Sequence, residues 1–133
     1  MRALVCLLAL SGLSGPVLAE TPADFLAVHA QEANAANPAI AGLSAERGQQ
    51  FFARTLGKEW SCTSCHTGNP AGAGKHAVTG KVIDPMAPAV NLSRFTNVAK
   101  VEKWFKRNCN DVLGRACSAQ EKGDVLAYLL TLP

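Results

Sequence analysis

The stretch Cys62-Thr63-Ser64-Cys65-His66 decides what kind of fold this chain can have. Two cysteines separated by two residues and followed at once by a histidine form the attachment motif of c-type haem. The thiols add to the two vinyl groups of the porphyrin, and the adjacent histidine reaches the iron from the proximal side. A zinc site would need a second pair of ligands, and a thioredoxin-like site would need a βαβ context, and both are missing. The sequence therefore predicts one covalent haem c on Cys62 and Cys65, with His66 as the proximal iron ligand.

The chain around this motif has the length of one domain and a helical pattern. From 68 to 90 it is rich in glycine, proline and alanine with little periodicity, which predicts one long wrapped loop. No stretch alternates well enough to predict a strand. The expected fold class is therefore all-α. The four expected helices are Pro22–Ala35, a helix from the N-cap Ser44 through Leu56, Asn97–Asn108, and a helix from Ser118, with Glu121 completing a capping box, through Leu130.

The first nineteen residues have the pattern of a cleaved secretory signal peptide, leaving a mature domain at 20–133. Arg2 precedes a short apolar run, and Val17-Leu18-Ala19 provides small residues before a cleavage site at Glu20. The run is too short and too interrupted by glycine and proline to span a membrane, although an N-terminal anchor is the alternative. No other segment of the chain could span a bilayer. An exported bacterial protein is expected in the periplasm.

Cleavage also changes the charge and the cysteine count. Loss of Arg2 lowers the formal net charge from +3 to +2, and no basic cluster of the kind that binds nucleic acid remains. Cys6 leaves with the signal, so four of the five cysteines remain in an oxidising compartment that permits disulfides. Cys109 and Cys117 have no metal-like partners nearby in the sequence. The default expectation is a Cys109–Cys117 disulfide.

The second axial ligand of the iron determines the functional class, because a strong permanent ligand suits electron transfer and a weak one suits ligand binding. Met86, in the loop between Pro85 and Pro88, is the obvious candidate, although it could simply fill space at the haem edge. His76 stands in a polar, glycine-rich segment that favours solvation over ligation. His29 is expected at the surface or boundary of the first helix.

Asn108 is a further candidate because it falls inside an apolar helical stripe. At 100° per residue, Asn108 and four apolar side chains all fall within about 60° of one helical direction, with Asn108 close to the centre of this arc, and the basic residues and Glu102 are turned away from it. A buried amide without a partner costs about 1–3 kcal/mol, so Asn108 needs a partner. A helix C-cap or a core hydrogen bond is the ordinary role, and iron is the alternative. The arc residues are Val98, Val101, Trp104 and Phe105, and the basic residues are Lys100, Lys103, Lys106 and Arg107.

Four stretches, "CTSCH", "PMAPAVNLSRFT", "KVEKWFKRNCNDVLGRAC" and "EKGDVLAYL", together resemble the sphaeroides haem protein (SHP) family. The likeness covers nearly the whole mature chain. SHP proteins are small exported cytochromes, so the resemblance implies a class I cytochrome c-like fold wrapped round one haem. It also implies that Asn108 binds ferric iron on the distal side, with Cys109 and Cys117 as the adjacent disulfide. A relative, cytochrome c double-prime, carries a histidine where this chain has Asn108, so the asparagine favours the oxygen-binding branch.

The resemblance further implies a redox-gated activity. The asparagine would leave on reduction and open the iron to oxygen, nitric oxide, carbon monoxide or other small ligands, with electrons supplied by a dihaem c-type cytochrome. It leaves open whether the protein also turns over oxygen or nitric oxide as an enzyme. The alternative function is a simple electron-transfer cytochrome c with His66 and Met86 as the two axial ligands.

Overall fold

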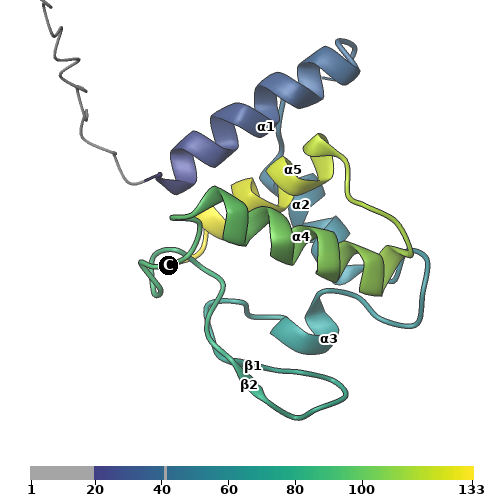
Figure 1. Cartoon of the computed structure of the whole chain (residues 1–133), viewed down its shortest axis with the longest axis vertical. Coiled ribbons are helices and arrows are strands. Elements are labelled where there is room, and N and C mark those ends of the chain that lie inside the picture. Colours follow the sequence, from purple (N-terminus) through teal and green to yellow (C-terminus); the bar gives the residue numbers. More distant parts are fainter. Residues whose placement is uncertain (1–19, 41) are drawn as a thin grey trace, which may run out of the picture.

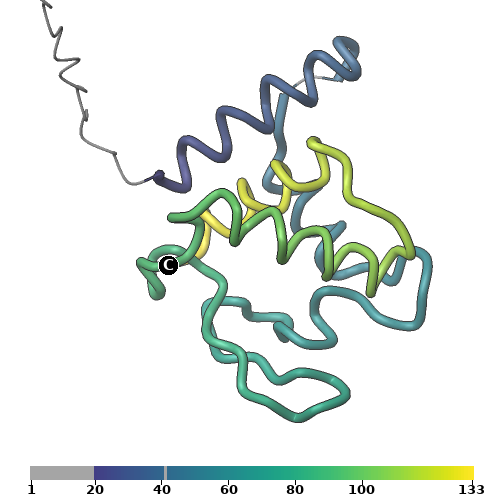
Figure 2. The backbone as a smooth tube through the Cα atoms, in the orientation of Figure 1, coloured from purple at the N-terminus to yellow at the C-terminus, as the bar shows by residue number. Residues whose placement is uncertain are grey.

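The structure, a computed structural model, describes residues 20–40 and 42–133, so the expected signal peptide at 1–19 lies outside the described residues. The described part is mostly helical, as expected, and Figures 1 and 2 show its longer helices gathered together, with the long teal and green loop extending to one side of them. None of its helices is long and apolar enough to cross a membrane. The elements in chain order are α1 (Pro22–Ala36), α2 (Ala45–Ala53), α3 (Thr63–His66), β1 (Gly74–Lys75), β2 (Val82–Ile83), α4 (Val98–Leu113) and α5 (Ala119–Leu130).

The helix α5 is the centre of the fold, and both α1 and α2 pack against it. The contact between α2 and α5 is close because Gly48 has no side chain. A Cβ atom built at Gly48 would lie 1.8 Å from the carbonyl oxygen of Asp124. The two helix backbones could not approach this closely with any other residue at position 48.

A buried carboxylate fixes the same crossing. Asp124 is 4% exposed, and its Oδ1 accepts a hydrogen bond from the backbone N–H of Ser44 at 2.6 Å. Arg47 donates to both carboxylate oxygens, from Nε at 2.9 Å and from Nη2 at 3.1 Å. Because the charge of Asp124 is paired and hydrogen-bonded, it can remain in the interior, and it ties the start of α2 to α5.

The apolar core lies around α5 and is largely aromatic. Its buried members are Phe25, Phe52, Phe95, Val125, Leu126, Tyr128 and Leu129. Val101 and Phe105 of α4 and Met86 of the long loop pack against this cluster from the side. The side chains of four different segments therefore meet round one helix, and α4 reaches the core with only part of its apolar stripe.

Helix α4 is longer than the sequence predicted. It continues past Asn108 to Leu113 and ends at Gly114, whose φ of +75° is the left-handed conformation that suits glycine after a helix. The expectation that the helix ends at Asn108 is therefore wrong, and Asn108 is not a C-cap. The predicted disulfide is present between Cys109 in α4 and Cys117, next to the N-cap of α5, with a Cα–Cα distance of 5.6 Å.

The other boundaries follow the expectations with three differences. Helix α1 starts at Pro22 with a Thr21 capping box, and α5 has the predicted Ser118–Glu121 capping box. Helix α2 ends at Ala53, three residues before Leu56. A one-turn helix, α3, was not predicted, and neither was the antiparallel pair β1–β2, in which Gly74 pairs with Ile83 and Lys75 pairs with Val82. These short elements depend on contacts that local sequence does not reveal.

Candidate functional site

Helix α3 brings the two cysteines and the histidine of the C-x-x-C-H motif together on one turn. The backbone N–H of His66 bonds to the carbonyl of Cys62 at 2.9 Å, and the N–H of Cys65 bonds to the same carbonyl at 3.3 Å. Both thiols are free and half-buried. Burial raises the pKa of the Cys62 thiol to about 11, so this position favours an uncharged sulfur. A thioether is an uncharged sulfur, and the site therefore fits covalent haem attachment.

His66 has the environment of a neutral ligand. Burial, assisted by the positive charge of Arg94, lowers the pKa of His66 to about 4. The ring packs beside Phe52, with 6.2 Å between the ring centroids, and its Nδ1 is buried without a hydrogen-bond partner in the described structure. A neutral imidazole is the form that binds a metal. Within the described residues, 20–40 and 42–133, no group of three or more His, Cys, Asp or Glu side chains could hold a free metal ion.

The hairpin β1–β2 supports α3 through a glycine that the sequence analysis did not single out. A Cβ atom built at Gly74 would lie 2.2 Å from the carbonyl oxygen of Cys65 and 3.0 Å from the Cα of His66. The backbone N–H of Ala77, in the turn of the same hairpin, donates to Sγ of Cys65 at 3.4 Å. The only local signal is the glycine-rich run at 72–74, a composition that is equally typical of a loop.

Asn108 lies inside α4, half-buried, on the turn next to the bridged Cys109. The structure gives its side-chain amide no hydrogen-bond partner among the described residues. On the same stripe, Val101 and Phe105 face the core, whereas Trp104 is 44% exposed and Val98 is exposed. Because α4 is rotated in this way, Asn108 and Trp104 lie on the flank of the helix and not at the centre of its buried face.

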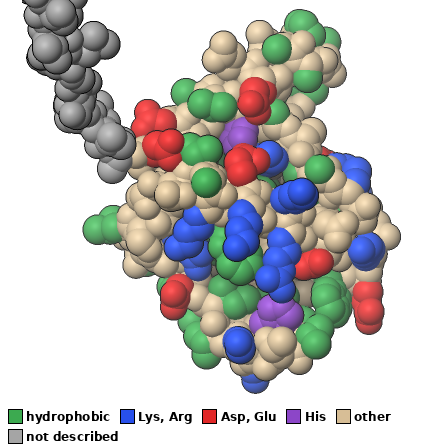
Figure 3. Space-filling model, viewed as in Figure 1, with side chains coloured by type: hydrophobic (Ala, Val, Ile, Leu, Met, Phe, Trp, Pro, Cys, Tyr) green, Lys and Arg blue, Asp and Glu red, His purple; other side chains and the backbone are tan. Residues whose placement is uncertain are grey.

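The charged residues of α4 divide between two sides of the helix. Its basic residues are exposed, as expected, and Figure 3 shows Lys and Arg side chains gathered over α4. Glu102 is not on that outer side, because it pairs with Lys122 of α5 and lies 3.5 Å from the ring of His29. His29 itself is 3% exposed, so the expectation of a surface or boundary histidine is wrong. Its position on the inner face of α1 matches the four-residue spacing of Phe25, His29 and Ala33.

Met86 stays close to the core and is held by its backbone. Its N–H donates to the carbonyl of Pro70 at 2.8 Å, which closes the loop across its base. Arg94 steadies the preceding residues through hydrogen bonds to the carbonyls of Pro85 at 2.8 Å and Asp84 at 2.6 Å. The structure therefore leaves Met86 as a partly buried side chain in an ordered loop, which keeps it as the competing ligand candidate.

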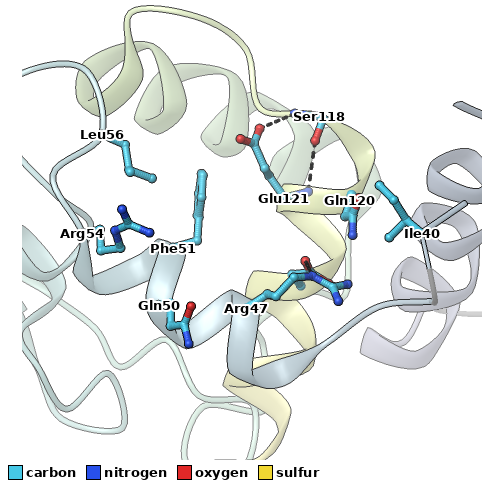
Figure 4. Close-up of a pocket in the computed structure, with 10 residues that line it drawn as sticks. Ile40, Arg47, Gln50, Phe51, Arg54, Leu56, Ser118, Gln120 and Glu121 are labelled. Carbon is cyan, nitrogen blue, oxygen red and sulfur yellow. Dashed lines mark hydrogen bonds and ion pairs between the residues drawn. The ribbon is translucent and has the colours of Figure 1, made fainter. Parts of the chain in front are cut away.

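His76 is engaged in the hairpin turn. Its Nδ1 accepts hydrogen bonds from the backbone N–H groups of Val78 and Thr79, both at 3.2 Å. The ring is therefore held in the turn by its Nδ1, in the polar segment for which the sequence favoured solvation. An open pocket between α2 and α5 (Figure 4) is lined by Arg47, Phe51 and Glu121 among others, and it contains none of the candidate site residues.

Comparisons with known proteins point to one group. The family described as "Domain of unknown function (DUF1924)" matches residues 38–129. Cytochrome c'' from Methylophilus methylotrophus is 52% identical over 74% of this chain and 72% of that protein. The cytochrome c-type protein SHP from Cereibacter sphaeroides is 46% identical over 88% of this chain and 90% of that protein. The solved structure described as oxidized SHP, an oxygen-binding cytochrome c, superposes with a TM-score of 0.76 at 42% identity, covering 85% of this chain and 98% of that chain.

Proposed function

The chain belongs to the DUF1924 family and is a relative of the c-type cytochromes cytochrome c'' and SHP, and from these relationships we propose that it is a periplasmic cytochrome with redox-gated ligand binding. The cofactor of these relatives, and of this chain, is haem c with its iron. In the proposed site Cys62 and Cys65 hold the haem, His66 is the proximal ligand, and Asn108 binds ferric iron on the distal side.

The environment of α3 supports the proximal half of this site. The low pKa of His66, about 4, keeps its imidazole neutral and able to bind iron across the neutral pH range. The free, half-buried thiols of Cys62 and Cys65 stand one helical turn apart, beside that imidazole. Gly74 lets the hairpin pack directly against the backbone of this turn.

The observation that carries the distal half is the amide of Asn108. It stands inside α4, half-buried and without a hydrogen bond in the described structure, beside a cysteine fixed by a disulfide. Its carbonyl oxygen is a hard, weak, neutral donor, which suits Fe(III) better than Fe(II), so Asn108 departs on reduction. When bound, the haem supplies one-electron redox chemistry and a coordination position for small ligands. The released amide remains on α4, where its NH₂ group can donate a hydrogen bond to oxygen.

The small ligands in this proposal are oxygen, nitric oxide and carbon monoxide. The solved structure of SHP is described as that of an oxygen-binding cytochrome c, and this chain has the amide-bearing helix that the proposal requires. The proposed electron donor is a dihaem c-type cytochrome. The exposed basic side of α4 would suit a donor with an acidic docking surface.

The decisive experiment compares the visible spectra of oxidised and reduced protein for two variants. Asn108→Ala is expected to open the ferric site to water and added anions, while Met86→Ala changes the ferric spectrum little. The reduced wild-type protein is expected to be high-spin and to bind carbon monoxide rapidly. As a further check, Asn108→His should give a bis-histidine ferric spectrum, because an imidazole is a stronger ligand than an amide.

The second candidate function is a plain electron carrier with His66 and Met86 as ligands. It is favoured by the position of Met86 against the core and by its hydrogen bond to Pro70. In that case both oxidation states are low-spin, Met86→Ala abolishes the low-spin ferric spectrum, and Asn108→Ala is silent. That result would replace the ligand-binding proposal.

A further inference from the structure

A buried histidine joins three helices outside the candidate iron site. His29 of α1 packs edge-on against Phe105 of α4, with 6.4 Å between ring centroids and an interplanar angle of 84°. On the α5 side, a Cβ atom built at Gly123 would lie 3.2 Å from Cβ of His29, so the helices meet closely here. Helix α1 precedes the segment at 38–129 that matches the family, so that match does not include His29.

Both ring nitrogens of His29 face carboxylates. Nδ1 lies 3.4 Å from Oε2 of Glu32 in α1, and Nε2 lies 3.5 Å from Oε1 of Glu102 in α4. The other oxygen of Glu102 pairs with Nζ of Lys122 in α5. These are the charged groups that face His29 from α1, α4 and α5, and together they form a network of alternating sign.

The protonation state of His29 determines how many hydrogen bonds its ring can donate to the two carboxylates. A neutral imidazole has one N–H, so one nitrogen would present a lone pair to a carboxylate. The imidazolium has two N–H groups and can donate towards Glu32 and Glu102 at once. Nε2 is buried, and in the described structure it has no hydrogen bond of good geometry, so it lacks an alternative partner. The protonated ring is therefore the form that draws α1 and α4 together.

The network acts on the helix that carries the proposed distal ligand. Glu102 and Phe105 belong to α4, as does Asn108, and the end of α4 beyond Asn108 is fixed by the Cys109–Cys117 disulfide. We propose that protonated His29 is a positioning residue that holds α4 on α1, and so keeps Asn108 within reach of ferric iron. Loss of the proton loosens the middle of α4 and makes release of Asn108 easier. The inference rests on the proposed function, because it requires Asn108 to be the ferric ligand.

Thermodynamic linkage fixes the direction in which the proton on His29 changes the reduction potential. If the proton on His29 favours the Asn108-bound ferric form, then release of Asn108 on reduction favours loss of that proton. Groups that sense only the charge at the iron behave in the opposite way, because reduction makes that charge less positive and favours proton uptake. A contribution of His29 to the reduction potential must therefore raise the potential as pH rises.

The test measures the reduction potential and the ferric spectrum of the haem-loaded protein from pH 5 to pH 8, the range in which histidines titrate. Asn108→Ala provides the reference spectrum of the released form. At pH 5, His29→Gln should weaken ferric Asn108 ligation about fivefold to tenfold, a typical coupling between two sites. For a tenfold effect the wild-type potential lies about 59 mV below that of the variant. The two potentials should converge by pH 8.

Two further variants complete the design. Glu32→Gln, which removes an exposed partner and is not expected to impair folding, should give a smaller shift of the same sign and pH dependence. His76→Gln, a histidine outside the network, should follow the wild-type curve. An offset that is independent of pH, or identical curves for wild type, His29→Gln and Glu32→Gln, would overturn the inference. If Asn108→Ala has the wild-type ferric spectrum, the proposed function itself fails, which is a separate result.

Discussion

At the scale of single residues, the haem motif at Cys65 and His66 is readable from the sequence, whereas the burial of His29 is not. The spacing of Cys65 and His66 alone predicts haem attachment and proximal ligation, and the structure places both residues on the single turn of α3. The burial of His29 could not be predicted, because its partner Glu102 comes from a helix far along the sequence. The four-residue spacing of Phe25, His29 and Ala33 contained a signal of a shared inner face, but it does not identify what covers that face.

Gly74 gives a direct test of how the hairpin supports α3. Gly74→Ala places a methyl group 2.2 Å from the carbonyl of Cys65, so the hairpin must move away from the haem-attachment turn. We expect a loss of about 1–3 kcal/mol in the free energy of unfolding, as for other overpacked positions, and a lower yield of haem-loaded protein. Thermal unfolding and the ratio of haem to protein absorbance measure both effects.

Gly68→Ala is the matched control, because a Cβ atom there meets nothing within 4 Å. Its unfolding free energy should stay within about 0.5 kcal/mol of the wild-type value, as for other surface substitutions. Equal behaviour of the two variants would mean that the hairpin does not press against α3.

At the scale of elements, helix starts were predicted better than helix ends. The Ser118–Glu121 capping box is a local pattern, so the start of α5 agreed with the structure. The predicted end of α4 at Asn108 is wrong because the helix continues to Gly114, six residues further on, where the left-handed glycine ends it. The strand pair Gly74–Lys75 and Val82–Ile83 has only two residues on each side, too few to form an alternating pattern.

The disulfide is expected to control both stability and ligation at this scale. Replacing Cys109 and Cys117 by serine frees the end of α4 from the start of α5. The loss in unfolding free energy should be about 2–3 kcal/mol on the loop-entropy estimate for so short a loop. The ferric spectrum should also shift towards that of Asn108→Ala, because the residue beside the bridge is no longer fixed.

Ala116→Ser is a suitable control, since it adds a hydroxyl at an exposed position beside the intact bridge. Denaturant titration gives the stability, and the ferric spectrum gives the ligation. A destabilised double-serine variant with an unchanged ferric spectrum would show that the disulfide does not position Asn108.

At the scale of the whole molecule, the uneven distribution of charge matters more than the small net charge. The basic residues of α4 are exposed and form none of the ion pairs in the described structure. They gather on the face shown in Figure 3, on the helix that carries Asn108. The members of this surface are Lys100, Lys103, Lys106 and Arg107.

We expect this surface to accelerate reduction by a small anionic reductant. In the double variant Lys103→Glu/Lys106→Glu, the rate constant at low ionic strength should fall several-fold, because like charges now repel the reductant. The difference should shrink as salt is added, because the Debye length falls to about 8 Å at physiological ionic strength. Stopped-flow reduction at several salt concentrations measures it.

The control compares two single charge reversals, Lys103→Glu on this surface and Arg54→Glu elsewhere. Arg54→Glu alters an exposed residue at the end of α2 that lines the pocket of Figure 4 and is not part of the basic surface of α4, so it should reduce the rate much less than Lys103→Glu. Equal effects of the two substitutions would mean that the anion responds to net charge and not to this surface.

The close approach of Gly48 to Asp124 sets a limit on how far the protein can be shortened. The two partners stand near opposite ends of the domain, and the haem-attachment turn, the hairpin and the bridged helix all lie between them in sequence. A truncation from either end that removes Gly48 or Asp124 removes the contact between α2 and α5. The haem-attachment turn, the hairpin and the bridged helix, which lie between these two residues in sequence, then lose the same support. The match to the family, from 38 to 129, spans both partners and leaves out α1. Any shortened form that keeps the crossing of α2 and α5 must therefore retain nearly the whole domain, from the start of α2 to the middle of α5.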